Sequence, residues 1–467
     1  MRATSLGHAG ILIETDYGSI VCDPWFEPAF LGSWFVFPRN DRLSPELMER
    51  VCNPTFLYIS HQHGDHLDEV FLREKMSKDT SVLLPGLPTR ELERQLSRLG
   101  FHTFIRTTSG VETEIAQGLT VAIHVESAIS DGPGGDSAIV VSDGKSRLVN
   151  QNDCRTGDLT SLRAHGPVDL HYLQFSGAIW YPMVYDMPID EKRQLARSKV
   201  ESQFARAERY VDAVGARVVL PSAGPPCFLD DDLFHLNMID TDDISIFADQ
   251  SVFIDRLTKR GVERPTLNVP GTCVEVKQDD ITVTHATRIE EVMRPFVDKK
   301  DYLLEYQADW SSWLTHQRAS WPSGSTDLVS ALNVWWGPLF VLSPTLRSAI
   351  GGNCRIISGD ADFLVDFGRG EVRKYADESV RYGFEIPRPL LEKVVHEKAV
   401  DWSNSLFLSC RFSAWREGEF NEFLYNFFKS LSVERMRRAE EEAKRRTGDQ
   451  DERSDEIELG GFIMQRK

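Results

Sequence analysis

The stretch "FLYISHQHGDHLDEV", residues 56–70, crowds three histidines and an aspartate into six positions. The apolar run before them is typical of a buried strand, and the glycine among them allows the backbone to turn closely. Imidazole and carboxylate groups together suit first-row transition metals. The pattern predicts a metal site at the end of this strand, with the candidate ligand and catalytic set His61, His63, Asp65 and His66. Capping of the following helix is the alternative role for the aspartate.

The first half of the chain alternates strand patterns with turns and then with helices. Residues 11–26 predict a hairpin that turns near Asp16, Tyr17 and Gly18. Helical spacing predicts a helix within 88–100 and a long amphipathic helix over 189–215. Strands that pair first as hairpins and are then separated by helices indicate a layered α/β domain.

The pattern changes near residues 285–300. Residues 354–375 predict a β-meander with glycine-rich turns, and residues 420–446 predict one long terminal helix. A polar, charged stretch follows and is typical of a linker. The last residues, "IELGGFIMQRK", predict the opening strand of a further unit. The predicted division is a first domain over 1–295, a smaller α+β domain over 300–445, and a linker with that strand over 446–467.

Charge and composition exclude several classes of function. The chain has 53 basic and 71 acidic residues, a formal net charge of −18, which argues against nonspecific binding of nucleic acid or anionic membranes. No apolar segment is long enough to insert into a membrane, and the amino terminus lacks a secretory signal. The seven cysteines are dispersed without a C-x-x-C pair. We therefore expect reduced thiols and a cytoplasmic location.

The motif "SHQHGDH" resembles the H-x-H-x-D-H motif of the metallo-β-lactamase superfamily, and "SLGHAGILIE" and "VCDPWF" resemble the opening hairpin of that fold. The resemblance implies an αββα sandwich, here followed by the smaller α+β domain. It also implies that the first two histidines of the motif hold one metal and that the aspartate and last histidine hold a second. His8 and Asp23 would lie near them, with ordinary structural roles as the alternative.

The resemblance further implies a bridging carboxylate at the end of a later strand. Asp153, after the apolar run in "SRLVNQNDC", is the candidate, and capping of a turn is its alternative role. Asp131 is a further candidate ligand, beside Asp136 and His124. The stretch "VVLPSAGPPCF" after a late strand supplies no histidine, so a full di-zinc ligand set is not visible. A histidine and carboxylate site with open positions suits iron and dioxygen at least as well.

Further stretches resemble the UDP-N-acetylmuramate hydroxylases of mycobacteria and their relatives, which are similar to CMP-N-acetylneuraminate hydroxylases. These stretches are "DGPGGDSA" (131–138), "QFSGAIWYPMVYDMP" (174–188), "SAGPPCFL" (222–229), "RYGFEIP" (381–387) and "EFLYNFFK" (422–429). The resemblance implies an iron-dependent monooxygenase that converts an N-acetyl to an N-glycolyl group on a nucleotide-activated amino sugar, a peptidoglycan precursor. One or two irons are expected, with zinc possible. Candidate substrate-binding residues are Arg155, Trp180 and Tyr181.

The same family carries a Rieske 2Fe-2S domain with C-x-H and C-x-x-H ligand pairs. None of the seven cysteines has that spacing. The resemblance therefore implies that the cluster lies in a missing carboxyl-terminal domain or in a separate protein, with a ferredoxin or reductase as partner.

Two other functions compete with this hypothesis. One is a zinc-dependent hydrolase of the same fold that acts on a phosphoester or lactone, favoured by the intact motif. The other is a binding protein without catalysis, in which the metal would be absent or structural. Turnover without a reductant would indicate the hydrolase, and nucleotide-sugar binding by a folded apoprotein would indicate the binding protein.

Overall fold

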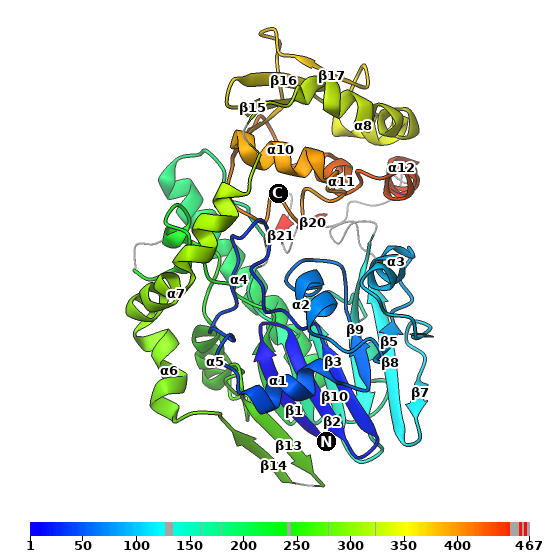
Figure 1. Ribbon diagram of the computed structural model, residues 1–467, viewed down its shortest axis with the longest axis vertical. Helices are drawn as coiled ribbons and strands as arrows, with labels where there is room; N and C mark the ends of the chain where they lie inside the picture. The colour runs from blue at the N-terminus through cyan, green and yellow to red at the C-terminus, as the bar shows by residue number, and fades with distance from the viewer. Residues whose placement is uncertain are drawn as a thin grey trace.

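The computed structural model (Figure 1) describes residues 1–126, 134–158, 160–177, 179–240, 244–278, 280–322 and 324–448, and two short strands near the carboxyl terminus. Two packed sheets form the amino-terminal part. The first is 8-stranded, in the order β14-β13-β1-β2-β3-β4-β5-β6, and its members from β3 to β6 run parallel. Its strands are β1 (Arg2–Gly7), β2 (Gly10–Thr15), β3 (Gly18–Cys22), β4 (Phe56–Tyr58), β5 (Ser81–Leu84), β6 (Phe104–Arg106), β13 (Cys273–Lys277) and β14 (Asp280–Thr284).

The second sheet is 6-stranded, in the order β12-β11-β10-β9-β8-β7. Strands β10, β11 and β12 are parallel, so their carboxyl ends meet at one edge. Its strands are β7 (Thr113–Ala116), β8 (Leu119–Glu126), β9 (Asp136–Ser142), β10 (Arg147–Asn152), β11 (Leu170–Gln174) and β12 (Val218–Ser222).

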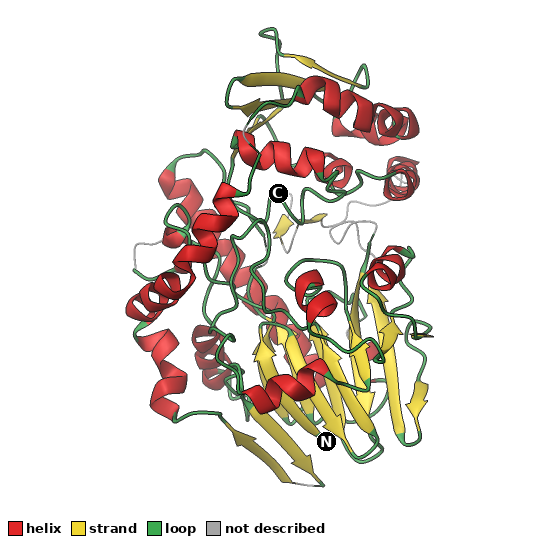
Figure 2. Ribbon diagram, in the orientation of Figure 1, coloured by secondary structure: helices red, strands yellow, loops and turns green. Residues whose placement is uncertain are grey.

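Alternating side chains explain why the two sheets pack face to face. In β2, Ile11 and Ile13 enter the core between the sheets, whereas Leu12 faces the outer helices. Helices α1 (Pro45–Cys52), α2 (Glu69–Glu74) and α3 (Glu91–Arg98) cover the first sheet, and α4 (Ile189–Val214) and α5 (Gln250–Lys259) cover the second. Figure 2 shows these helices on either side of the strands. The arrangement is the αββα sandwich of the metallo-β-lactamase fold, as predicted.

The carboxyl-terminal part has a 5-stranded sheet in the order β17-β16-β15-β18-β19, packed against helices. Helices α6 (Ile289–Val297) and α7 (Lys299–Ala319) connect it to the sandwich. Its strands are β15 (Cys354–Ser358), β16 (Ala361–Asp366), β17 (Glu371–Lys374), β18 (Tyr382–Glu385) and β19 (Ser413–Arg416). Its helices are α8 (Leu328–Leu342), α9 (Pro344–Ile350), α10 (Arg388–His396), α11 (Glu422–Phe428) and α12 (Val433–Gly448).

The packing of α7 bears on the predicted boundary near residue 300. Trp310 and Tyr306 pack edge-on against Phe35 of the sandwich, with ring centroids 5.4 and 5.9 Å apart. The core of the carboxyl-terminal part instead draws on α8 and later elements. Helix α7 thus packs with the first domain, although it lies beyond residue 300.

The single terminal helix predicted over 420–446 is wrong. The structure breaks it into α11 and α12, because Phe427, Phe428 and Leu431 all enter the core as the chain turns. Ser432 then starts the second helix, since its Oγ accepts a hydrogen bond from Arg435 N at 3.3 Å. Periodicity alone does not report such a turn when both segments are amphipathic.

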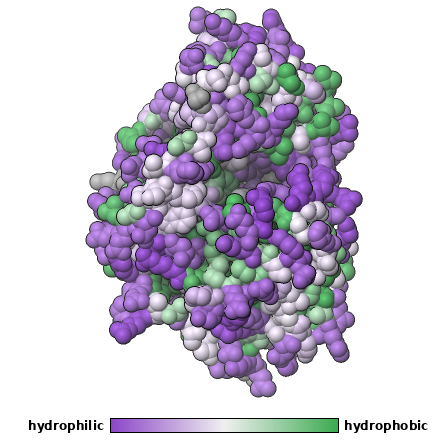
Figure 3. All heavy atoms as spheres, in the orientation of Figure 1, coloured by the Kyte–Doolittle hydropathy of each residue, from purple (hydrophilic) through white to green (hydrophobic). Residues whose placement is uncertain are grey.

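Where the sequence predicted the opening strand of a further unit, the chain forms a two-stranded hairpin, β20 (Ile457–Leu459) and β21 (Phe462–Met464), and β21 lies near α4. The face seen in Figure 3 is mainly hydrophilic. Apolar side chains gather there over α8, where Val334 and Val341 are exposed. No helix among the described residues is long and apolar enough to cross a membrane.

Candidate metal centre

The site lies at the edge where strands from both sheets end. His8 follows β1, Asp23 follows β3, the motif follows β4 and Asp153 follows β10. His8 and Asp23 have φ angles of 50° and 40°, in the left-handed region that favours glycine. Asn152, just before Asp153, has a φ of 39°. Strained backbone at several adjoining strand ends is a common feature of functional sites.

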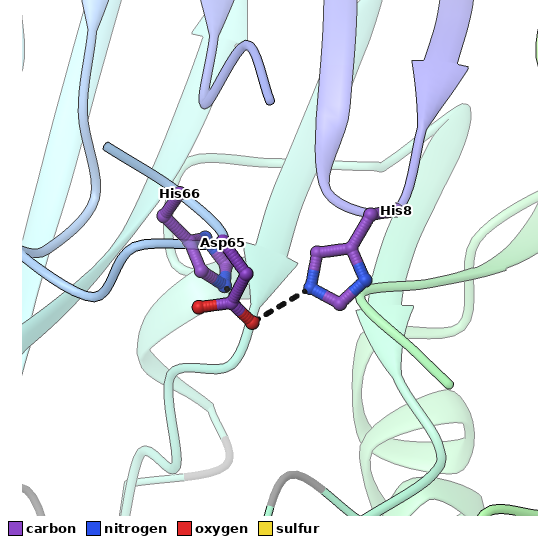
Figure 4. A group of neighbouring side chains, drawn as sticks. All are labelled: His8, Asp65 and His66. Carbon is purple, nitrogen blue, oxygen red and sulfur yellow. Dashed lines mark hydrogen bonds and ion pairs between the residues drawn. The ribbon is translucent and has the colours of Figure 1, made fainter. Parts of the chain in front are cut away.

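Two overlapping groups of side chains could hold a metal. One is His8, Asp65 and His66, and the other is His61, His66 and Asp153; in each group the ligand atoms lie within 4.8 Å of one another. Figure 4 shows His8 Nε2 facing the Asp65 carboxylate at 3.1 Å. His66 belongs to both groups, so the two candidate positions are adjacent. We call these five residues, together with His63, the ligand cluster.

Carboxylates behind the histidines fix their orientation. Asp23 Oδ2 lies 2.9 Å from His66 Nδ1, and Asp136 Oδ1 lies 3.1 Å from His61 Nδ1. A carboxylate on Nδ1 leaves the Nε2 lone pair for a metal. His66 Nε2 lies 3.5 Å from Asp153 Oδ1. Asp136, an acidic candidate from the sequence, makes this supporting contact in the structure.

Buried atoms in the ligand cluster lack hydrogen-bond partners among the described residues. They are Asp65 Oδ1, His66 Nε2 and Asp153 Oδ1. A buried polar atom without a partner is costly, and a cation held between these atoms would satisfy all three. The nitrogen and oxygen donor set fits zinc or iron.

The electrostatics of the ligand cluster favour a charged histidine and charged carboxylates. Burial lowers the pKa of His66, but Asp153, Asp65 and Asp23 outweigh it and raise this pKa well above the ordinary value. Burial would raise the pKa of Asp65, yet His66 and His8 lower it below the ordinary value. A divalent cation bound here would take the place of the proton on His66.

His63 stands apart from the two groups. Its Nδ1 lies 2.7 Å from His61 Nε2, and burial and His61 lower its pKa well below the ordinary value. Lys429, at the end of α11 in the carboxyl-terminal part, lowers the same pKa further. His63 therefore lies where the two parts of the molecule meet, and its role as a ligand stays a prediction.

The other predicted site residues are dispersed around this edge. Asp131 lies outside the described residues. Arg155 and Tyr181 are half-buried, Arg155 two positions beyond Asp153. Trp180 is buried in the core, stacked on Tyr185 with centroids 6.1 Å apart. His124 pairs with His165 at 3.0 Å, apart from the ligand cluster.

The end of β12 supplies no histidine, as the sequence indicated. The strand ends at Ser222 and the chain continues as Ala223 and Gly224, and Ala223 N donates to His8 O at 3.0 Å. Ala223 has a φ of 50°, so this strand end shares the backbone strain of its neighbours. The loop approaches the ligand cluster with backbone and small side chains.

Sequence reasoning missed the contributions of the carboxyl-terminal part. Arg435 of α12 is buried, and its Nη2 lies 3.5 Å from Oε1 of Gln62, the residue between two motif histidines. Gln62 in turn donates to Gln95 of α3 at 2.7 Å. A basic run in an amphipathic helix gives no signal that one arginine turns inward.

Comparisons with known proteins agree with this architecture. Residues 328–445 match the family model described as "Rv3818-like, SCP2-like domain". Over 475 residues, the chain is 40% identical to Rv3818 of Mycobacterium tuberculosis (strain H37Rv), which is named as a Rieske 2Fe-2S iron-sulfur protein; the match covers 100% of this chain and 91% of the relative. The chain belongs to the Rv3818 family. The matched model begins at α8, so we call the carboxyl-terminal part the Rv3818-like domain.

More distant similarities cover only part of the chain. The chain is 26% identical over 234 residues to the cytidine monophosphate-N-acetylneuraminic acid hydroxylase of Xenopus laevis, covering 48% of this chain and 38% of that one. Among solved structures, Igni18, a metallo hydrolase of Ignicoccus hospitalis, has 16% identity and a TM-score of 0.39, covering 61% of this chain and 99% of that one.

Proposed function

We propose that this Rv3818-family chain is an iron-dependent monooxygenase that hydroxylates the N-acetyl group of a nucleotide-activated amino sugar, converting UDP-N-acetylmuramate to UDP-N-glycolylmuramate. The observation that carries the proposal is the buried ligand cluster, whose unpartnered atoms converge while the end of β12 supplies no further histidine. The names of the Xenopus and Mycobacterium relatives support hydroxylation and electron delivery by a Rieske cluster.

The residues of the ligand cluster have distinct tasks in this proposal. His61, His66 and Asp153, with Asp65, His8 and His63 beside them, would hold the metal. Iron there would supply, with dioxygen and two electrons from a donor, the oxidising power that a methyl C–H bond requires. Asp23 and Asp136 hold the Nδ1 protons of His66 and His61, so that both rings keep their orientation.

The overall reaction balances with an external donor. One oxygen atom of dioxygen enters the acetyl methyl group as a hydroxyl. The other oxygen atom is reduced to water, and this reduction consumes two electrons and two protons. Because none of the seven cysteines has Rieske spacing, we propose that the electrons come from a Rieske domain or partner protein.

The test combines metal analysis with turnover. We would purify the chain without oxygen, quantify iron and zinc, and then supply dioxygen, a reductase, a Rieske-type donor and UDP-N-acetylmuramate. The expected product is one oxygen atom heavier by mass spectrometry, and it carries the heavy isotope when labelled dioxygen is used. A reaction without the donor is the control.

A different set of results would favour the zinc-dependent hydrolase over the monooxygenase. Two zinc ions, hydrolysis of phosphodiester or lactone substrates without reductant, and no oxygenated product with any donor would contradict the hydroxylase. Label from water in the product would also contradict it, because a monooxygenase takes that atom from dioxygen.

A further inference from the structure

A β-bulge interrupts the parallel pairing of β10 with β11. Asn150 pairs with Tyr172, and Asn152 pairs with Leu173, the next residue of β11. Gln151 is therefore an extra residue on β10. A bulge of this kind bends its strand and redirects the side chains that follow it, and bulges are common beside active sites. It thus bears on the candidate ligand that directly follows β10.

The bulge decides which face of the sheet carries Asp153. Leu148 belongs to the core between the two sheets, whereas Val149 belongs to the cluster on the outer face, with part of α4. Simple alternation from Val149 would put Gln151 and Asp153 on the outer face as well. A shift of one residue reverses that assignment. Asp153 Oδ1 lies 3.5 Å from His66 Nε2, on the side of the first sheet.

The extra residue is held by a buried histidine of β11. His171 and Gln151 are 0% and 1% exposed, and His171 Nε2 lies 3.0 Å from Gln151 Oε1. Gln151 Nε2 donates to Cys154 O at 2.9 Å, so Gln151 Oε1 is the acceptor and His171 is the donor. Cys154 N donates back to Gln151 O at 3.0 Å. These hydrogen bonds enclose Asp153, which lies between Gln151 and Cys154 in the chain.

His171 is neutral at physiological pH, so its Nε2 carries a proton to donate. Burial lowers the pKa of His171 from 6.5 to about 3. Its Nδ1 then has a bare lone pair, and this buried atom has no hydrogen-bond partner among the described residues. The polar contact of the ring is therefore the one with Gln151.

The rest of β11 on the same face is apolar. Leu173 and Phe175 follow His171 at i+2 and i+4, and they belong to the cluster beneath α4 and α5. An apolar side chain at position 171 would avoid the free-energy cost of a buried, unpartnered Nδ1. The hydrogen bond to Gln151 is the contact that an apolar side chain would not supply.

The carboxylate of Asp153 depends on the backbone that carries it. Its Oδ1 has no hydrogen-bond partner in the described part of the chain. Asp153 N donates to Asn152 Oδ1 at 2.8 Å, and Asn152 Nδ2 donates to Ser137 O at 3.4 Å. Asn152 has a φ of 39°, and a strained backbone of this kind persists only where the surrounding contacts hold it.

We infer that His171 is a positioning residue for the metal centre, because through Gln151 it holds the bulge that turns Asp153 toward the other members of the ligand cluster. His171 touches no candidate ligand and acts through a glutamine side chain and the backbone. The inference rests on metal binding by the ligand cluster, which the monooxygenase and the hydrolase share, and it does not depend on the substrate.

The test uses cobalt(II), whose visible absorption reports the ligands and geometry around the ion. His171→Leu removes the N–H donor, so it should lower cobalt affinity roughly tenfold, by competition with a chelator, and change the absorption. His171→Gln keeps an N–H donor at the end of the side chain and should restore both. Tyr172→Phe is the matched control, because Tyr172 is equally buried but faces the core between the sheets. It should change neither.

A double substitution separates positioning from a general loss of stability. In protein that carries Asp153→Asn, adding His171→Leu should change cobalt affinity less than about twofold, because the carboxylate that His171 positions is then absent. Far-UV circular dichroism and the melting temperature check the fold of each variant. If His171→Leu does not fold, Gln151→Met gives the same comparison, because it keeps the side-chain length and loses both hydrogen bonds.

Two results would overturn the inference. One is unchanged cobalt affinity and absorption in folded His171→Leu or Gln151→Met. The other is an equal loss of affinity with and without the Asp153 carboxylate, which would show that His171 supports only the fold.

The outcomes also separate this inference from the proposed function. The expected cobalt results without hydroxylation of UDP-N-acetylmuramate would keep the positioning role and refute the reaction. Hydroxylation by the unsubstituted protein, with unchanged metal properties in His171→Leu and Gln151→Met, would keep the reaction and refute the positioning role. Failure of the unsubstituted protein to bind cobalt, iron or zinc would refute both.

Discussion

Asp136 lies behind the ligand cluster and orients it without belonging to it. Because its carboxylate holds His61 Nδ1 at 3.1 Å, Asp136→Asn should weaken metal binding by roughly 10–100-fold while the fold persists. Competition with a chelator measures the affinity, and far-UV circular dichroism checks the fold. Asp158→Asn, an exposed change between β10 and β11, is the matched control. Unchanged affinity in Asp136→Asn would show that His61 is oriented by other contacts.

We expect protons and metal to compete for His66. Its pKa is raised well above the ordinary 6.5 because Asp153, Asp65 and Asp23 together outweigh the effect of burial. As pH falls, His66 therefore protonates at a higher pH than an isolated histidine, and the apparent affinity for zinc should decline from above about pH 6.5 downward. Affinity measured from about pH 8 to about pH 5.5 checks this. A decline that begins only well below pH 6 would contradict it.

The residues of the site differ in how far the sequence reveals them. The motif is readable because its four residues are neighbours on the chain, and Asp153 because an apolar strand precedes it. The pairing of Asp136 with His61 depends on β9 starting at the edge where β10 ends. Arg435 looks like an ordinary surface cation until the fold shows which face of α12 is buried.

Helix α12 reaches the loop of the histidine motif through Arg435. Its guanidinium donates to Glu91 at 2.6 Å and to Asp401 at 3.0 Å, besides the contact with Gln62. Removing one partner of a buried ion pair leaves the other charges uncompensated, so Arg435→Met should cost about 3–5 kcal/mol. The midpoint of urea unfolding measures this loss.

The control for Arg435→Met is Arg437→Met, an exposed change two residues along the same helix that should leave the midpoint nearly unchanged. Equal midpoints for the two variants would show that Arg435 does not stabilise the contact between α12 and α3. Metal affinity measured in Arg435→Met would also show whether Gln62 transmits an effect to the motif histidines.

Elements whose hydrophobic residues follow a clear period could be predicted from the sequence. The turns that interrupt such elements could not. The hairpin of β2 and β3 and the long helix α4 follow directly from alternation and from helical spacing. The turn between α11 and α12 depends on the packing of Phe428 and Leu431 in the core. This packing is a tertiary contact that the local sequence does not reveal. The placement of α7 on the sandwich depends likewise on its contacts with Phe35.

At the scale of the molecule, the sandwich and the Rv3818-like domain share one apolar core. Trp34 from the sandwich and Trp336 from the Rv3818-like domain belong to the same buried cluster. Large apolar interfaces hold domains rigidly together, so we expect a single cooperative unfolding transition by calorimetry. Two well-separated transitions would show that the domains unfold independently.

Asp230 and Arg411 form a buried ion pair across this interface. Asp230 Oδ2 lies 2.7 Å from Arg411 Nη1, and Arg411 also donates to Ser33 Oγ at 2.8 Å and Gly32 O at 3.2 Å. Asp230→Asn removes the negative charge and leaves a buried guanidinium uncompensated, which should cost about 3–5 kcal/mol. Because the apolar core remains, the variant should unfold at a lower temperature and still in one transition.

The control for Asp230→Asn is Asp232→Asn, because Asp232 is exposed and lies in the same loop. Its melting temperature should match that of the unsubstituted protein, since an exposed ion pair contributes little. If Asp230→Asn instead splits the transition in two, the ion pair and not the shared core holds the domains together. The contact between Arg435 and Gln62 would then depend on it, and metal affinity should fall in that variant.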